Sequence, residues 1–218
     1  MTSLDAQLAS LRLRARWARI LLLAVIALCS TGLALGAVML VGVRGYAVIQ
    51  MLAFVTGLLT LLYGLIALGS ALLVALWIWR AHANLRTLGL DGLNFSPSWA
   101  VLSFLVPLLN LVVPFQAMRE LYNRSIGEDA LLAAQSAPDV TAWWACYIPG
   151  SFIPAVLLAM KSVGPLTGVH IVTPPLADGM LLLFAIVLLA GSAFFLQRII
   201  ATVTAAQSAV TGVGDTFA

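Results

Sequence analysis

Long apolar runs recur along this chain and constrain its fold more than any other feature. They fall at about residues 20–43, 48–79, 143–161 and 179–200. A helix needs about 20 apolar residues to cross the roughly 30 Å of hydrocarbon in a bilayer. Only 9% of the residues are charged, whereas soluble domains carry about 25%, so this composition cannot build a water-exposed surface. The runs predict an all-α, polytopic membrane helix bundle that forms a single membrane domain over residues 1–218.

The stretch of residues 97–125 decides how many times the chain crosses the membrane. A serine-proline pair at residues 96–97 is a helix-start signal, because serine caps a helix and proline fits its first position. Pro107 and Pro114 then interrupt the apolar run on either side of Asn110, and each removes a backbone donor. Two topologies follow: five full spans, or four spans plus a proline-bent element that is re-entrant or lies along the inner interface.

The basic residues discriminate between these topologies, because cytoplasmic loops are rich in Lys and Arg. Five spans with a cytoplasmic N-terminus place seven basic residues inside and four outside. Four spans leave only Arg44 and Lys161 outside, and the nine that then lie inside are Arg12, Arg14, Arg16, Arg19, Arg80, Arg86, Arg119, Arg124 and Arg198. We therefore predict four spans with the N-terminus in the cytoplasm.

Residues 1–19 form a basic lead-in to the first span. The apolar run that follows is longer than the 7–15 residues or so of a secretory h-region, which indicates an uncleaved signal anchor. Leu4, Leu8, Leu11 and Ala15 recur at helical spacing. The lead-in is expected either to lie as an amphipathic helix on the cytoplasmic headgroups or to continue the first span.

Three shorter segments are expected to lack long helices. Residues 126–142 are a polar linker, residues 162–178 form a loop that contains His170, and residues 202–218 form a frayed tail. Asp178 is suited to cap the last span at its N-terminus.

Small residues within the spans have two possible roles. Gly32 and Gly36 have the GxxxG spacing that lets another helix backbone approach closely. Cys29 and Cys146 both fall in apolar segments, where cysteine behaves as a small hydrophobic residue. Whether the two cysteines meet stays open at this point.

A fairly specific pattern of proline and polar residues covers residues 77–125, in the segments WIWRAHANLR, GLNFSPSWAV and VPLLNLVVPFQAMRELYNRS. It resembles the bacterial membrane-protein family known as domain of unknown function 4328. The matching positions are Trp77, Arg80, Asn84, Phe95, Ser96, Pro97, Trp99, Ala100, Pro107, Asn110, Pro114, Gln116, Met118, Glu120 and, approximately, Ser125. Where family members carry a Trp-rich run and an aromatic-basic pair, this chain has residues 103–105 and 112–113. The resemblance implies a membrane bundle and supplies no activity.

The motifs of several enzyme classes do not occur in the sequence. It contains no HExxH, GxSxG, CxxC or glycine-rich phosphate loop. Glu120 is the only candidate acid near the interface, and Arg124, four residues later, is expected to neutralise it. We predict a non-enzymatic structural, regulatory or partner-binding membrane protein without cofactor or metal. The alternatives are a small transporter or channel with a polar path near Asn110 and, third, a membrane enzyme.

Two groups of residues are candidate sites. The candidate polar cluster, which has a structural or functional role, comprises Arg80, Asn84, Asn110, Gln116, Arg119 and Glu120. The candidate contacts for anionic lipid headgroups are Arg80, Arg86, Arg119 and Arg124. The expected partners are membrane lipid and either a second copy of the chain or another membrane protein, not nucleic acid. The excess of Arg over Lys indicates a bacterial source and hence the cytoplasmic membrane.

Overall fold

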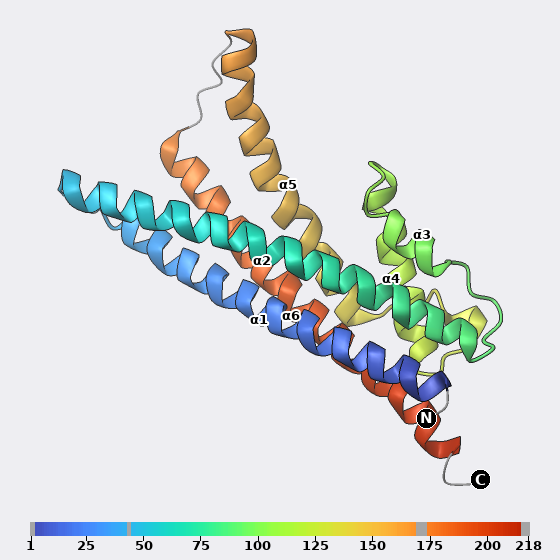
Figure 1. Cartoon of the computed structure of the whole chain (residues 1–218). Coiled ribbons are helices and arrows are strands. Elements are labelled where there is room, and N and C mark those ends of the chain that lie inside the picture. The colour runs from blue at the N-terminus through green and yellow to red at the C-terminus, as the bar shows by residue number, and fades with distance from the viewer. Residues whose placement is uncertain (1–2, 43–44, 169–173, 215–218) are drawn as a thin grey trace. The chain divides into compact units, whose positions relative to one another are not determined.

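The computed structural model describes residues 3–42, 45–168 and 174–214, and these residues are almost entirely helical (Figure 1). The elements in chain order are α1 (Ser3–Leu40), α2 (Tyr46–Thr87), α3 (Pro97–Leu102), the 3₁₀-helix η1 (Leu109–Leu111), α4 (Val113–Ser125), the 3₁₀-helix η2 (Ala130–Leu132), α5 (Pro138–Thr167) and α6 (Pro175–Gly214). The predicted all-α fold is confirmed.

Four of these helices are long and apolar enough to cross a membrane, as expected for a multi-pass membrane protein. Their candidate spans are Asp5–Met39, Tyr46–Thr87, Pro138–Val163 and Leu176–Ala209. The stretch between α2 and α5 is instead divided into α3 of 6 residues, η1 of 3 and α4 of 13. Each piece is shorter than the 20 residues or so that a span requires, which confirms four long helices plus a proline-bent segment over the five-span alternative.

The internal contacts group the chain into two compact units. Unit 1 comprises Met1–Leu22, Ala67–Ala142 and Phe195–Ala218, and unit 2 comprises Leu23–Ile66 and Trp143–Phe194. Each long helix therefore contributes one part to each unit. That residues 1–218 form a single membrane domain stays a prediction.

In unit 1, the first turns of α1 are part of the packed core. Leu8, Leu11, Ala15 and Ala18 are at most 4% exposed, and they share one face because they recur at helical spacing. α1 runs without a break from Ser3, so the lead-in continues the first span. The alternative of a separate helix on the headgroups is wrong, because the apolar face of these turns packs on protein.

Both ends of the described chain lie together in unit 1 (Figure 1). Arg12 Nε donates a hydrogen bond to Ser208 Oγ at 3.1 Å. An even number of spans produces this arrangement, whereas five spans would separate the ends. The expected frayed tail is wrong for residues 202–214, since α6 continues to Gly214, and Val203 and Gln207 are buried. The rest of that tail, residues 215–218, lies outside the described residues.

Local signals explain how α2 ends and α3 begins. After Thr87, Gly89 and Gly92 adopt φ of +71° and +76°, conformations that glycine takes without a Cβ penalty. The predicted start of α3 is correct: Ser96 Oγ accepts from the backbone N–H of Trp99 at 3.1 Å, and Pro97 occupies the first turn.

In unit 2, glycines allow close packing within the chain. A Cβ at Gly36 would collide with Leu183 of α6, and a Cβ at Gly150 of α5 would lie 3.1 Å from Leu188 Cβ of α6. The GxxxG glycine at position 36 therefore serves an intramolecular contact. Cys29 and Cys146 are both free thiols.

The connection between α5 and α6 is shorter than the predicted loop of residues 162–178. α5 extends to Thr167 and α6 begins at Pro175. Asp178 lies in the first turn of α6 rather than at its cap, and its carboxylate is 3.2 Å from Lys161 Nζ. His170 lies outside the described residues.

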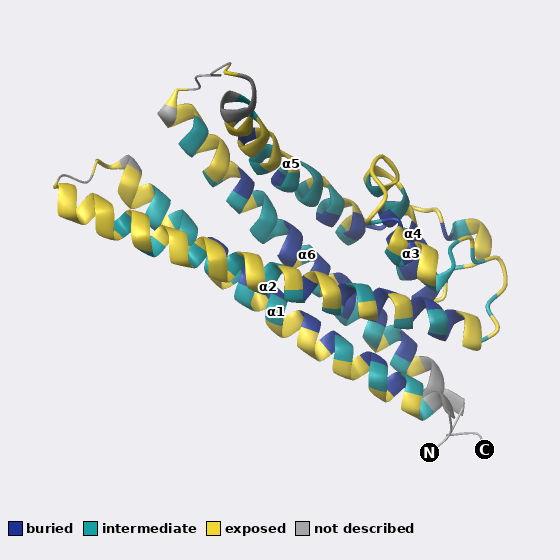
Figure 2. Cartoon of the chain, turned by 45° about the horizontal axis from the view of Figure 1, so that its top comes forward, coloured by how far each residue is buried: buried dark blue, intermediate teal, exposed yellow. Residues whose placement is uncertain are grey.

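Many residues on the helices of unit 2 are exposed (Figure 2), and large apolar side chains are prominent among them. On α2, Phe54, Leu61 and Leu65 are 68%, 69% and 71% exposed. A soluble monomer rarely shows so continuous an apolar surface, so this face is suited to contact with lipid chains.

Candidate functional site

The polar interior of unit 1 is centred on Glu120 of α4, whose side chain is only 3% exposed. Its Oε2 accepts from the backbone N–H of Asn94 at 2.8 Å and from Asn94 Nδ2 at 2.9 Å. Its Oε1 accepts from the backbone N–H of Phe95 at 3.2 Å. Hydrogen bonds to a charged acceptor are among the stronger ones in proteins, so Glu120 holds the loop between α2 and α3 against α4.

The next turn of α4 binds main-chain carbonyls of two loops. Arg124 donates from Nη1 to Glu128 O at 2.8 Å and from Nη2 to Asp91 O at 2.9 Å. Asn123 Nδ2 contacts the carbonyls of residues 132, 133 and 135 at 3.0–3.4 Å. The predicted pairing of Arg124 with Glu120 is wrong, because each side chain is turned to a different stretch of backbone.

Gln207 of α6 joins three helices. Its Nε2 lies 3.1 Å from Ala81 O of α2 and 3.0 Å from Ser125 Oγ of α4. Its Oε1 accepts from Asn84 Nδ2 of α2 at 3.3 Å. Asn84 and Gln207 are each 1% exposed, so this network lies in the interior and fixes the packing of α2, α4 and α6.

A second set of contacts joins α2 to α1 and α6. Trp77 Nε1 donates to Thr204 Oγ1 at 3.1 Å. Arg14 Nη1 donates to Leu76 O at 2.9 Å, and Arg80 Nε donates to Gln7 O at 3.4 Å. Arginine side chains near the start of α1 therefore bind α2 or α6.

His82 is buried between α2 and α4. Nδ1 donates to Ile78 O at 3.0 Å within α2, and the ring lies against the main chain of Ala117 in α4. No group of three or more His, Cys, Asp or Glu side chains gathers at one point within the described ranges.

The structure does not bring the six residues of the candidate polar cluster to one point. Arg80, Asn84 and Glu120 bind α1, Gln207 and the α2–α3 loop respectively. The other three lie elsewhere on the proline-bent segment: Asn110 is half-buried in η1, Gln116 is exposed on α4, and Arg119 stacks over the Phe115 ring at 5.2 Å.

The four candidate lipid contacts differ in accessibility. Arg124 is 9% exposed, and both of its terminal nitrogens are occupied by carbonyls. Arg80 and Arg119 are half-buried, and Arg86 is exposed. Headgroup binding by the last three stays a prediction.

Sequence reasoning missed Asn94, Asn123 and Gln207 as members of the polar interior. A signal existed for Gln207, because it continues the helical stripe of Ile200 and Val203 into the supposed tail. Asn94 and Asn123 carry no comparable signal, since their partners are main-chain groups of loops.

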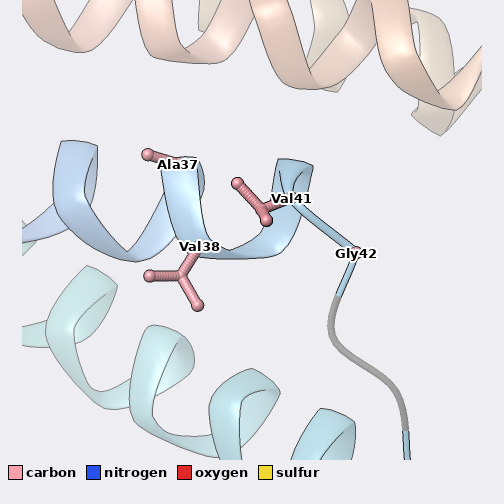
Figure 3. Close-up of a pocket in the computed structure, with 4 residues that line it drawn as sticks. All are labelled: Ala37, Val38, Val41 and Gly42. Carbon is pink, nitrogen blue, oxygen red and sulfur yellow. The ribbon is translucent and has the colours of Figure 1, made fainter.

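A shallow depression of about 350 Å³ at the end of α1 lies in unit 2 (Figure 3). It is lined by Ala37, Val38, Val41 and Gly42. These residues supply no acid, base or nucleophile, so the depression is suited to apolar contacts and provides no catalytic group.

Comparison with known proteins identifies one related family. The model of the family described as Domain of unknown function (DUF4328) matches residues 45–205, which is more than half of the 218-residue chain. No curated protein and no solved structure matches the chain. The matched range contains all three segments of the proline and polar pattern.

Proposed function

Because the chain belongs to the DUF4328 family, which is defined without an activity, we propose that it is a non-enzymatic protein of the bacterial cytoplasmic membrane. In this role it acts by binding, as a structural or regulatory partner of another membrane protein or of a second copy of itself.

The observation that carries this proposal is the environment of Glu120. A general acid or base must come within hydrogen-bond reach of its reactant. Glu120 is 3% exposed, and both carboxylate oxygens already accept hydrogen bonds from the α2–α3 loop. Asn123, Arg124 and Gln207 are likewise occupied by protein groups. The polar interior thus favours a stabilising role over catalysis.

The exposed arginines support a cytoplasmic position for unit 1. Arg12, Arg16, Arg19 and Arg86 are exposed, and all belong to unit 1, which also contains both ends of the described chain. Because cytoplasmic loops are rich in basic residues, we propose that both termini lie in the cytoplasm. A C-terminal green fluorescent protein fusion should fluoresce, and a C-terminal alkaline phosphatase fusion should be inactive. The reverse result would overturn the orientation.

The binding role is tested by cross-linking in bacterial membranes. Photo-reactive residues replace Leu61 and Leu65 on the exposed face of α2, and the buried Trp77 is the matched control position. We expect defined adducts from the exposed positions only, heavier than the 23.1 kDa chain. A chain that stays monomeric there and in mild detergent, with no adducts from any exposed position, would contradict the proposal.

One observation favours the second candidate, a small transporter or channel. Asn110 Oδ1 is a buried atom for which the described structure shows no hydrogen-bond partner, and such an atom calls for an explanation such as a bound ion or water. Proton and alkali-cation flux into vesicles holding the full chain is the measurement. Flux lost in Asn110→Ala and retained in Gln116→Ala would support this candidate. No flux in the unmodified protein would remove it.

A further inference from the structure

The turn between α3 and α4, residues 103–112, exposes apolar side chains at its tip. Leu105 is 77% exposed, Leu108 80% and Val112 51%. The ten residues, SFLVPLLNLV, include no charged side chain. Exposure of this kind in water is unfavourable by roughly 25 cal/mol per Å² of apolar surface, so an apolar environment around the tip is favoured.

The backbone at the tip is strained at Leu108. Leu108 adopts φ +67° and ψ −49°, and the N–H of Leu109 donates to Pro107 O at 2.8 Å. These values define a γ-turn with positive φ, a rare and strained conformation. Residues other than glycine are disfavoured in this conformation, yet the chain places a leucine at this point.

Most amide groups of the turn are paired within the segment, which favours entry into hydrocarbon. Ser103 and Leu105 donate to Trp99 O and Leu102 O at 3.0 and 2.9 Å, and Asn110 donates to Val106 O at 2.9 Å. Leu111 and Val112 donate to the carbonyls of residues 108 and 109 at 3.1 and 3.0 Å. Unpaired backbone groups would cost several kcal/mol each in lipid, and these pairs reduce that cost.

The turn and the loop that joins α2 to α3 lie at opposite ends of α3. Within unit 1, Glu120 and Arg86 hold the loop that precedes α3 near the end of α2. From this loop α3 leads away from the end of α2, and the turn lies at the end of α3 opposite the loop (Figures 1 and 2). Trp99 of α3 and Trp79 of α2 are 41% and 40% exposed, and tryptophan is enriched where membrane meets water.

We propose that the α3–α4 turn dips into the acyl-chain layer, from the side of the bilayer on which α2 ends, and that Leu105 and Leu108 contact lipid chains. The occupant is lipid rather than protein because the same chain already crosses the bilayer beside this turn, and because the turn is uncharged and has most of its amides paired. Arg119, stacked over the Phe115 ring at 5.2 Å, then lies at the boundary with the headgroups. This inference does not rest on the proposed function.

Fluorescence quenching in lipid vesicles tests the proposal on the full chain. In a background with Cys29→Ala and Cys146→Ala, an environment-sensitive dye is attached through Leu108→Cys, or through Leu105→Cys in a second variant. Leu131→Cys is the matched control, because Leu131 is also a leucine in a short element of unit 1 and is 95% exposed. The vesicles are phosphatidylcholine with or without bromine on the acyl chains.

We expect blue-shifted emission and strong quenching by brominated chains at positions 105 and 108, and neither at position 131. An impermeant maleimide should react at least about tenfold more slowly with Leu108→Cys than with Leu131→Cys, because hydrocarbon excludes it. Equal quenching and equal maleimide reactivity at positions 108 and 131 would overturn the proposal. Protection of position 108 in native membranes but not in pure lipid vesicles would also overturn it, since a protein would then be the occupant.

Discussion

Replacing Glu120 by Gln tests whether the buried carboxylate holds the α2–α3 loop. The two bonds from Asn94 converge on Oε2, at 2.8 and 2.9 Å, and the bond from Phe95 ends on Oε1 at 3.2 Å. A glutamine oxygen can keep the Asn94 pair, but its NH₂ group then faces the N–H of Phe95. One charge-assisted bond is lost, and the other two lose the charge of their acceptor.

The size of the effect follows from these bonds. A hydrogen bond to a charged group contributes about 1.5–3 kcal/mol, and the removal of a buried charge offsets part of the loss because glutamine is less costly to desolvate. We therefore expect Glu120→Gln to lower the free energy of unfolding by about 2 kcal/mol.

Denaturant-induced unfolding in mixed micelles measures the global change, and hydrogen exchange of the Asn94 and Phe95 amides measures the local one. Faster exchange should be confined to the α2–α3 loop. Glu128→Gln is the matched control. Glu128 accepts from Arg124 through its backbone carbonyl, which this substitution leaves in place. Wild-type stability and unchanged exchange in Glu120→Gln would refute the reasoning.

Three further substitutions, two of them paired with a control substitution, probe the packing within each unit by the same unfolding measurement. Gln207→Leu should cost about 2 kcal/mol, because the buried groups it joins on α2 and α4 lose their partner; no loss would contradict the network. Gly92→Ala should cost about 2 kcal/mol and Gly89→Ala about 1 kcal/mol. Both glycines have positive φ, but only a Cβ at position 92 would meet another side chain, that of Ala130 on η2, 2.9 Å away. Equal costs would show that this contact relaxes freely. Gly150→Ala should cost about 1–2 kcal/mol, whereas Gly57→Ala, which has open space, should stay within about 0.5 kcal/mol.

The α4 helix shows where spacing within the sequence is an insufficient guide. Glu120 and Arg124 stand four residues apart, a spacing that favours an ion pair on an isolated helix. In the structure both side chains bind loop backbone. Buried main-chain groups outcompete a surface pair because an unpaired group in the interior is costly, whereas an exposed pair contributes little.

The ends of α5 and α6 were mispredicted for a related reason. The tail after residue 201 and the loop after residue 161 look mildly polar or proline-rich in the sequence, yet α6 reaches Gly214 and α5 reaches Thr167. In α6, helix formation beyond residue 201 depends on tertiary packing rather than on intrinsic propensity. Val203 and Gln207, for example, are buried among side chains of unit 1.

The amino-acid sequence by itself determined the number of long helices, the break between α2 and α5, and the N-terminal start of α3. These depend on local quantities: the hydrocarbon thickness that an apolar run must match, the donor that each proline removes, and the cap that Ser96 supplies. Only the tertiary structure decided which polar groups meet. Asn84 and Gln207 are 123 residues apart, and Arg12 and Ser208 are 196 apart, and no periodicity along a chain specifies contacts over such separations.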